Sequence, residues 1–343
     1  MASDQPARRA TIHDVAKLAQ ASTAAVSRVL RDAYGVSDDM AARVKAAMKE
    51  LDYRPHASAR GMRGKTYTIG IVHPDLRNTF FPDIFSAVAE VILPTSRQIM
   101  MATSEWTSTE DVFAAMHDRR IEGMIVVAPH ISENKLVEAA RQAPLVLTHR
   151  HSYSTAYDTI VSDDDAGAEL VVRHLAELGH KHIVHLGPAN GRLATQLSFV
   201  TAKRARAYRN AMESLGLGKF AEVADCPHYT FEDGYRAAHE VLTRSRRPTA
   251  IFAGTDNVAF GVIQAAYDLG IELPRQLSLV GYDNTGTGGL GPLSLTSVDQ
   301  NPHEIGTLAA KMLLSRMDGR ESVERASITP QLVVRRTTAE PFE

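Results

Sequence analysis

The sequence predicts an N-terminal all-α helix-turn-helix domain followed by an α/β domain of two lobes with parallel sheets. Three observations support this fold class. The first 55 residues contain three short amphipathic helical patterns. From residue 67 onward, short apolar runs alternate with helical patterns, which is typical of parallel sheets with right-handed crossovers. The charge also divides, because residues 1–65 carry 12 Lys and Arg against 7 Asp and Glu, whereas the remainder carries 26 against 33.

The composition is that of a globular chain, with 44% hydrophobic and 23% charged residues and a net charge of -2. A length of 343 residues suggests two or three domains. Cys226 is the only cysteine and cannot form an internal disulfide. No apolar signal-peptide segment follows Met1, and no run of 18 apolar residues occurs. We therefore expect a cytoplasmic protein with no membrane segment and no cofactor.

Each of the three N-terminal helical patterns begins at a residue suited to capping it. These residues are Thr11, Ser22 and Ser37, and Asp14 three positions after Thr11 makes a variant of the capping box. Three short helices in about 45 residues predict a helix-turn-helix domain. The apolar side chains expected in its core are Val15, Leu18, Ala19, Val26, Val29, Leu30, Val44, Ala47, Met48 and Leu51.

The outer face of the second helix is small and rich in hydrogen-bonding groups: Ser22, Thr23, Ala24, Ser27 and Arg28. A helix with such a face can enter the major groove of DNA. Arg28 can reach O6 and N7 of guanine, while the methyl groups of Thr23 and Ala24 can contact thymine. The alternative is a three-helix bundle that docks another protein, and the basic balance of residues 1–65 argues against it.

Six strands and six helices are predicted after residue 67. About 270 residues exceed one compact open sheet, so we expect two lobes that divide near residues 161–163, with later segments crossing back. The predicted boundaries are 1–55 for the helix-turn-helix domain, 56–66 for a connecting segment, 67–161 with 294–324 for lobe 1, and 162–293 with 325–340 for lobe 2. The strands are 67–74, 122–129, 143–150, 182–188, 249–255 and 277–283, and the helices are 81–93, 110–118, 166–178, 202–215, 233–244 and 257–269.

Ligands of open α/β sheets bind beyond the carboxyl ends of the strands, so the residues that follow the predicted strands are the candidate site. They suit a polar small molecule, because aromatic faces can pack on a ring, carboxylates and amides can bind hydroxyl groups, and arginine can bind a carboxylate or an ether oxygen. These residues are Asp75, Phe80, Phe81, Thr148, His149, Arg150, Thr255, Asp256, Asp283 and Asn284.

The stretch "TIHDVAKLAQASTAAVSRVL" at residues 11–30 resembles the N-terminal signature of LacI/GalR-type bacterial transcription regulators. The resemblance continues through "VSDDDAGAELVVRHLAELGHKHIVHLG", "GTDNVAFGVIQAAYDLGIELPRQLSLVGYDN" and "PQLVVRRTT", to about Thr337. It implies a homodimer that binds operator DNA. It also implies that residues 67–343 form a domain similar to the periplasmic sugar-binding proteins, which dimerises and binds the effector. By position, it also implies that Arg204, Tyr229 and Asp283 contact the effector.

The segment 56–66 is basic and contains one large apolar residue, Met62. Taken alone, it has the composition of a flexible linker. The family resemblance implies instead that it folds on DNA as a hinge helix, with Met62 as a wedge in the minor groove where leucine is more usual. The DNA-contacting residues expected here are His56, Arg60, Met62 and Arg63; Thr11 and Ser37 complete the expected set in the helical head.

The third predicted strand departs from the family pattern, in which Asp-Arg is usual at its end. Here His149 and Arg150 are followed by His151. With Arg204, these residues favour a sugar acid or sugar phosphate as effector, with a neutral sugar as the open alternative and a purine less favoured. Thr255 also stands where asparagine is common in sugar responders.

Two other patterns are given structural interpretations. His174, His180, His182 and His185 have no cysteine partner, and two of them lie on a predicted strand, so we expect no metal site. The Gly-rich stretch "NTGTGGLGP" at 284–292 lacks a P-loop lysine, and we interpret it as a mobile loop that crosses between the lobes.

The sequence therefore predicts a sequence-specific DNA-binding transcriptional regulator, a repressor controlled by a sugar, sugar acid or sugar phosphate. Its partner is pseudo-palindromic double-stranded operator DNA, read by a homodimer. An enzyme is the competing class, but no nucleophile elbow, Walker lysine or Cys-His pair occurs. A carbohydrate-binding protein without operator-specific regulation is the other alternative, and the basic residues 1–65 argue against it.

Overall fold

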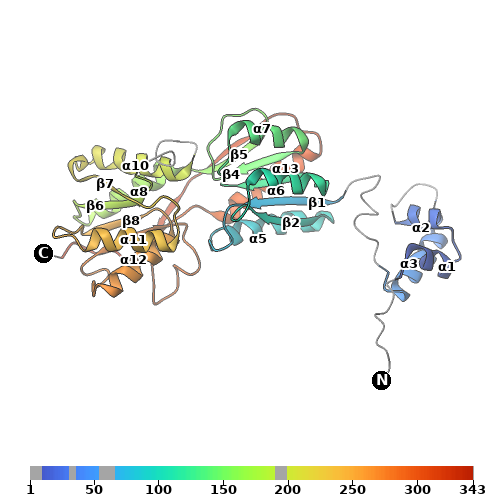
Figure 1. The fold of residues 1–343 in the computed structure, drawn as a ribbon, viewed down its shortest axis with the longest axis horizontal. Helices are drawn as coiled ribbons and strands as arrows, with labels where there is room; N and C mark the ends of the chain where they lie inside the picture. The colour runs from blue at the N-terminus through green and yellow to red at the C-terminus, as the bar shows by residue number, and fades with distance from the viewer. Residues whose placement is uncertain (1–9, 31–35, 54–65, 190–198, 343) are drawn as a thin grey trace, which may run out of the picture. The chain divides into compact units, whose positions relative to one another are not determined.

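The computed structural model describes residues 10–30, 36–53, 66–189 and 199–342. The chain divides into two compact units, Met1–Thr66 and Tyr67–Glu343, which we call the head and the body (Figure 1). The expected DNA contacts of the connecting segment, which are His56, Arg60, Met62 and Arg63, lie outside the described residues.

The head contains three capped helices, as the sequence predicts. The side chain of Thr11 accepts a hydrogen bond from the backbone N–H of Asp14, whose carboxylate accepts one from the N–H of Thr11 at 2.8 Å, so the capping box forms. Ser22 and Ser37 cap the second and third helices in the same way. The helices are α1 (Ile12–Leu18), α2 (Thr23–Val29) and α3 (Asp38–Glu50).

The core of the head is small and is built where the helices face one another. Val15, Val26 and Val44 are fully buried, and Ala19 and Ala47 are nearly so. One expected core residue differs, because Leu18 is 41% exposed. Leu18 is the last residue of α1, three positions after Val15, and lies at the end of the helix.

The first sheet of the body has six strands in the order β11-β5-β4-β3-β1-β2, and every neighbouring pair is parallel. Strand β1 lies next to the edge strand β2, and its Ile71 is paired in register with Met101 of β2 and Ile125 of β3. The strands are β1 (Thr68–His73), β2 (Gln98–Thr103), β3 (Gly123–Val127), β4 (Leu145–Thr148), β5 (Asp158–Ser162) and β11 (Arg325–Ile328).

The second sheet repeats this arrangement in the order β12-β10-β9-β8-β6-β7. Its neighbouring strands are parallel except for β12, which runs antiparallel to β10 at the edge. The strands are β6 (Ile183–Gly187), β7 (Glu222–Asp225), β8 (Ala250–Ala253), β9 (Ser278–Tyr282), β10 (Thr296–Asp299) and β12 (Gln331–Val333).

Helices cover both faces of each sheet, so the body consists of two three-layer lobes that lie side by side (Figure 1). In the first lobe, α5 and α13 share one core, and α6 and α7 share the other. In the second lobe, α11 and α12 cover one face, and α8 and α10 cover the other. The bounds are α5 (Phe81–Ile92), α6 (Thr109–Asp118), α7 (Glu133–Gln142), α8 (Asp164–Glu177), α10 (Val200–Ser214), α11 (Phe231–Leu242), α12 (Asp256–Asp268) and α13 (Pro302–Met317), with 3₁₀ turns η1 (Leu93–Thr95) and η2 (Gly218–Phe220).

The chain crosses between the lobes three times: between β5 and α8, between β10 and α13, and between β11 and β12. These crossings correct the predicted lobe boundaries, which assigned 294–324 to lobe 1 and 325–340 to lobe 2. Strand β10 pairs with β9 of the second sheet, while β11 pairs with β5 of the first. The buried carboxylate of Asp158 holds the segment before β11 on the first lobe, because it pairs with Arg316 and Arg320 and accepts the backbone N–H of Glu324.

The Gly-rich loop 284–292 was expected to cross between the lobes, and this expectation is wrong. It joins β9 to β10 within one sheet. The carboxylate of Asp256 holds both ends of this connection by accepting hydrogen bonds from the N–H and hydroxyl of Thr285 and from the hydroxyl of Ser297.

The lobes touch beside the first crossing. A single β-bridge joins Arg150 to Phe199, and the guanidinium of Arg150 lies 5.2 Å from the centre of the Phe199 ring. Nε2 of His151 lies 2.9 Å from a carboxylate oxygen of Asp164 at the start of α8. These contacts place the carboxyl ends of the two sheets toward a common space.

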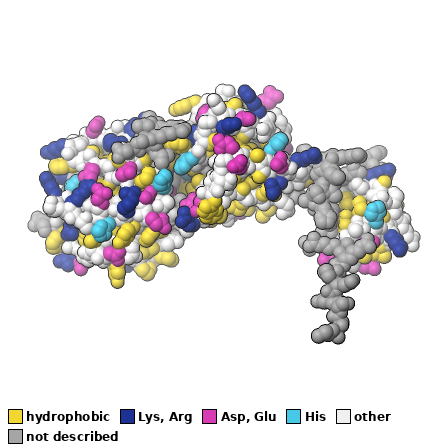
Figure 2. Space-filling model, in the orientation of Figure 1, with side chains coloured by type: hydrophobic (Ala, Val, Ile, Leu, Met, Phe, Trp, Pro, Cys, Tyr) yellow, Lys and Arg dark blue, Asp and Glu magenta, His cyan; other side chains and the backbone are white. Residues whose placement is uncertain are grey.

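Charged side chains of both signs are interspersed over the lobes on the face shown in Figure 2. The acidic excess of the body is therefore spread and not gathered into one patch on that face. Within the described ranges, no helix combines the length and apolar character needed to cross a bilayer.

Candidate functional site

The head presents the outer face of α2 as its candidate DNA-reading surface. Ser22, Ala24 and Arg28 are exposed, and Thr23 and Ser27 are half-buried. The hydroxyl of Ser22 already accepts the N–H of Ala25 at 3.1 Å, so it fixes the start of the helix. Thr11 and Ser37 have the same capping role at α1 and α3. A short helix with small outward residues and one exposed arginine has the chemistry that major-groove reading requires.

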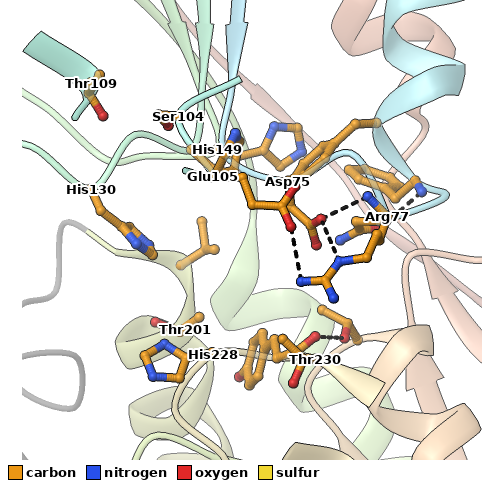
Figure 3. Close-up of a pocket in the computed structure, with 18 of the residues that line it drawn as sticks. Asp75, Arg77, Ser104, Glu105, Thr109, His130, His149, Thr201, His228 and Thr230 are labelled. Atoms are coloured by element: carbon orange, nitrogen blue, oxygen red, sulfur yellow. Dashed lines mark hydrogen bonds and ion pairs between the residues drawn. The ribbon is translucent and has the colours of Figure 1, made fainter. Parts of the chain in front are cut away.

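The body contains a cleft of about 600 Å³ between its lobes. The cleft opens at the carboxyl ends of both sheets, where the order of strands reverses at β1 and β3 in the first sheet and at β6 and β8 in the second. Figure 3 shows His130, His149 and Glu105 of the first lobe facing Thr201, His228 and Thr230 of the second.

Six of the residues predicted from strand ends line this cleft, and so do the two that the family resemblance adds. The six are Asp75, Phe80, Phe81, His149, Thr255 and Asp283, and the two are Arg204 and Tyr229. Four residues predicted from strand ends do not line it: Thr148, Arg150, Asp256 and Asn284. Strand β4 ends at Thr148, and the backbone of His149 is left-handed, with a φ of 54°. Beyond this turn of the chain, Arg150 points away from the cleft and donates to the carbonyls of Pro129 and Ile131.

Arg204 is the most constrained side chain of the cleft. Its Nε donates to Oδ1 of Asp164 at 2.7 Å, and its Nη1 donates to the carbonyl of Gly254 at 2.9 Å. The guanidinium also lies 3.7 Å above the ring of Tyr282. Burial alone would raise the pKa of Asp164, but Arg204 and His151 beside it hold that pKa below its usual value. Arg204 is thus fixed as a cation whose charge is already balanced.

Asp283 and Gln300 continue this network on the second lobe. Nη2 of Arg204 donates to Oε1 of Gln300 at 3.2 Å, and Nε2 of Gln300 donates to Oδ1 of Asp283 at 2.6 Å. Burial raises the pKa of Asp283 well above its usual value, although Arg204 opposes the shift. Its backbone has a φ of 114°, a strained value for a residue with a side chain. Burial therefore favours the protonated form of this carboxyl group more than solvent would.

His149 faces this network from the first lobe. Its ring packs edge-on against Phe80, with ring centres 5.3 Å apart, and its Nδ1 lies 3.2 Å from the hydroxyl of Thr148. Burial lowers the pKa of His149 to about 4, helped by the positive charge of Arg204. Nε2 is buried and has no hydrogen-bond partner among the described residues. A neutral imidazole with one unused nitrogen therefore faces the cleft.

Tyr229 and Thr255 complete the second lobe's wall. The ring of Tyr229 lies so close above Gly254 that a Cβ at that position would be 2.1 Å from the ring. Thr255 caps α12 by accepting the N–H of Val258, which directs the helix start toward the cleft. The rim opposite carries a more exposed ion pair, in which Nη2 of Arg77 lies 3.0 Å from Oε1 of Glu105 (Figure 3).

Sequence reasoning missed several cleft residues, and the reason is local. Glu105 follows β2 and Gln300 follows β10, two strands that the sequence did not predict. His130 lies in the loop after β3, just beyond the predicted end of that strand, and His228 lies in the loop after β7, a third strand that was not predicted. If β2, β7 and β10 had been predicted as strands, the residues that follow them would have included Glu105, His228 and Gln300.

The four histidines considered for a metal site have separate partners. His174 contacts the hydroxyl of Thr338, His180 contacts Thr249 and the carbonyl of Ala339, and His182 contacts Glu222. His185 contacts the carbonyl of Phe252 inside the second lobe. In the part of the chain that the structure describes, no cluster of His, Cys, Asp and Glu is arranged to hold a metal ion.

A helix-turn-helix head joined to two α/β lobes with a polar cleft defines a DNA-binding protein that responds to a small ligand. Comparison with known proteins agrees with this class. The family model described as "Bacterial regulatory proteins, lacI family" matches residues 11–56, and the model "Periplasmic binding protein-like domain" matches residues 172–338. The chain is 32% identical to the HTH-type transcriptional repressor PurR of Yersinia enterocolitica, over 97% of this chain and 98% of that protein.

The fold also matches solved structures. The lac repressor dimer bound to operator and the anti-inducer ONPF has a TM-score of 0.79 at 24% identity, covering 97% of this chain and 100% of that one. A LacI family regulator from Enterococcus faecium with bound ribose has a TM-score of 0.70 at 23% identity, covering 80% and 99%. The chain belongs to the lacI family of bacterial regulatory proteins, and it is a DNA-binding transcriptional regulator and not an enzyme.

Proposed function

We propose that this regulator is a cytoplasmic repressor, and that two copies bind one pseudo-palindromic operator. Each α2 enters the major groove with Ser22, Thr23, Ala24, Ser27 and Arg28, and the segments 56–66 bind the minor groove between the half-sites. An effector in the cleft changes the arrangement of the lobes and so changes operator affinity. Its contacts are Asp75, Phe80, Phe81, His149, Arg204, Tyr229, Thr255 and Asp283.

The effector class that the cleft supports best is a neutral hydroxylated molecule, such as a sugar. The observation that carries this proposal is the balanced charge at the deep end of the cleft. Arg204 is already paired with Asp164, His149 is neutral because its pKa is about 4, and the raised pKa of Asp283 favours its uncharged form. Neutral donors and acceptors beside aromatic rings match hydroxyl groups on a ring.

The positions of Arg150 and His151 weaken the case for a sugar acid or phosphate. Both were expected to make the cleft more cationic. Arg150 instead lies against Phe199 and backbone carbonyls, and His151 contacts Asp164 outside the cleft lining. The ribose bound to the Enterococcus faecium regulator supports the neutral class by analogy of fold.

A thermal-shift screen tests the effector class. The panel contains D-ribose, cellobiose, the corresponding sugar acids, sugar phosphates and purines. A ligand at 100 times its Kd should add about 2.7 kcal/mol of stability and raise Tm by several degrees. We expect a neutral sugar to do this, and we expect Arg204→Lys to reduce the shift, because lysine keeps the charge beside Asp164 but loses the two Nη contacts. A shift with anionic ligands alone would contradict the proposal.

DNA reading is tested with an operator selected from random duplexes at fixed salt concentration. Arg28→Ala should weaken operator binding by roughly 1 to 3 kcal/mol per half-site and relax the preference for guanine at one position. Arg43→Ala, which removes an exposed arginine from α3, is the control. A loss that is equal on all DNA sequences would mean that Arg28 contacts only phosphate. If no sequence is preferred at all, a carbohydrate-binding protein without operator-specific regulation becomes the better account.

A further inference from the structure

The chain enters the body through a backbone conformation that is unusual for a large residue. Tyr67, the first residue of the body, has a φ of 52°, which lies in the left-handed region. Its side chain is 46% exposed, so burial of the ring is only partial. A bulky residue in this region is strained and persists only where its surroundings hold it, so the contacts of Tyr67 call for a physical explanation.

The backbone of Tyr67 is held at both its amide and its carbonyl group. The N–H of Tyr67 donates to Oε1 of Glu122 at 2.8 Å, and the carbonyl of Tyr67 accepts the N–H of Gln98 at 2.7 Å. The backbone N–H of Glu122 in turn donates to the carbonyl of Thr68 at 2.8 Å. The two backbone bonds extend the ladders of the parallel strands. The bond to the amide of Tyr67 instead depends on one side chain, that of Glu122.

The carboxylate of Glu122 is itself held in place by an arginine. Its Oε2 lies 3.5 Å from Nε of Arg97, and the side chains of Arg97 and Glu122 are only 13% and 11% exposed. An ion pair that is largely shielded from water is screened less than a surface pair, so the carboxylate stays directed at the amide of Tyr67. We call these three residues, Tyr67, Arg97 and Glu122, the entry cluster.

The entry cluster lies at the amino ends of three adjacent parallel strands. Tyr67 precedes β1, Arg97 precedes β2 and Glu122 precedes β3. The segments that follow the same three strands line the cleft, with Asp75 after β1 among them. A strand of six residues spans about 20 Å, so β1 is a short connection between the cleft and the point where the chain enters the body.

We propose that Glu122 is a positioning residue for operator binding, because its carboxylate holds the backbone of Tyr67 and so fixes the conformation in which the connecting segment joins β1. This inference rests on the proposed function, in which residues 56–66 bind the minor groove. A fixed entry point reduces the backbone freedom that the protein must lose when two copies bind one operator. Glu122 does not line the cleft, so it has this effect without contacting the effector.

The hydrogen bond is tested by hydrogen–deuterium exchange, resolved to single amides, on the full-length protein without ligand. The amide of Tyr67 should be protected in the wild type. Glu122→Ala removes the acceptor, so this amide should exchange at least about tenfold faster. Glu122→Gln keeps an acceptor oxygen, so the exchange rate should stay within about threefold of the wild type. A Tyr67 amide that is unprotected in the wild type, or equally protected in Glu122→Ala, overturns the proposal.

Operator affinity is the second measurement, with the operator selected from random duplexes at fixed salt concentration. Glu122→Ala should weaken operator binding by about tenfold per copy of the chain, because the freed backbone must be ordered again on DNA. Glu122→Gln has the same net charge as Glu122→Ala, so it is the matched control for electrostatic effects on DNA binding. Its operator affinity should stay within about threefold of the wild type. Equal losses in the two variants, or no loss in Glu122→Ala, would contradict the positioning role.

Asp158→Asn is the control for a general loss of stability, because Asp158 is a buried carboxylate of the same lobe that pairs with Arg316 and Arg320. This variant should leave the exchange of the Tyr67 amide and the operator affinity as they are in the wild type. A loss of operator affinity as large as that of Glu122→Ala would overturn the positioning role. If the wild type prefers no DNA sequence, the proposed function fails and the positioning role fails with it, whereas exchange at Tyr67 still decides whether Glu122 holds this amide.

Discussion

The two lobes of the body share one strand order but bring different chemistry to the cleft. The second lobe contributes Arg204, Asp283 and Tyr229, which are buried and, in the first two cases, joined by hydrogen bonds through Gln300. The first lobe contributes a neutral His149 and an ion pair at the rim. The shared strand order brings the residues after the strands of both lobes to the cleft. The types of these residues then determine whether they hold a ligand rigidly or only line the edge of the cleft.

The sharpest way to break this comparison is to remove Arg204. Arg204→Ala should lower the free energy of unfolding by about 3 to 5 kcal/mol, because Asp164 is left as a buried charge without its main partner. Denaturant unfolding measures this loss. A decrease in the free energy of unfolding below about 1 kcal/mol would mean that the buried pair of Arg204 and Asp164 does not stabilise the second lobe as proposed.

Asp158 of the first lobe offers a comparison between two buried carboxylates. Asp158→Asn should lower the free energy of unfolding by about 2 kcal/mol, because Arg316 and Arg320 lose their charged partner. Asp158 lies away from the cleft lining, so effector affinity should stay within twofold. Calorimetric titration measures the effector affinity of this variant. A loss of affinity as large as that of Arg204→Lys would contradict the distinction between the two lobes.

His149 should make stability depend on pH. The unfolded imidazole has a pKa near 6.5, and burial lowers the folded pKa to about 4. Between these values the unfolded chain binds more protons, so the contribution is fully favourable above pH 6.5 and is lost as pH falls toward 4. At pH 5 the difference is about 2 kcal/mol for one group.

His149→Gln should therefore lose less stability than the wild type between pH 7.5 and pH 5. The exposed residue His303 is the control, because His303→Gln leaves every buried imidazole in place. Equal pH dependence of wild type and His149→Gln in urea unfolding would show that folding does not lower the pKa of His149.

The smallest effect is expected at the rim. Arg77 is 66% exposed, and its pairing with Glu105 is weakened by solvent. Arg77→Ala should change the free energy of unfolding by less than about 1 kcal/mol and effector affinity by no more than a few fold. A loss of effector binding comparable with that of Arg204→Lys would place the rim among the principal contacts.

The sequence predicted the elements whose patterns are long and regular. The caps at Thr11, Ser22 and Ser37 and six helices of the body lie within about two residues of their predicted starts. Helix capping and apolar spacing are local properties, so they can be read without knowing the tertiary structure.

The missed elements have weak local patterns and depend on tertiary pairing. Strands β10, β11 and β12 have only three or four residues each, with polar side chains among them, and their neighbours in the sheets come from distant segments. Their omission misplaced two crossings between the lobes and hid Gln300. Arg150 is different, because β4 ends at Thr148 and the left-handed backbone of His149, with a φ of 54°, breaks the alternation of the strand. A positive φ at a histidine is not readable from the strand pattern, so the orientation of Arg150 was missed.

The most direct test of the account is the affinity of the full-length protein for its selected operator as neutral sugars, sugar acids and sugar phosphates are added. The account predicts that a neutral sugar changes operator affinity at least tenfold, and that Arg204→Lys reduces this response while operator binding without effector persists. An operator affinity that no neutral sugar changes, or that only anionic sugars change, would contradict it.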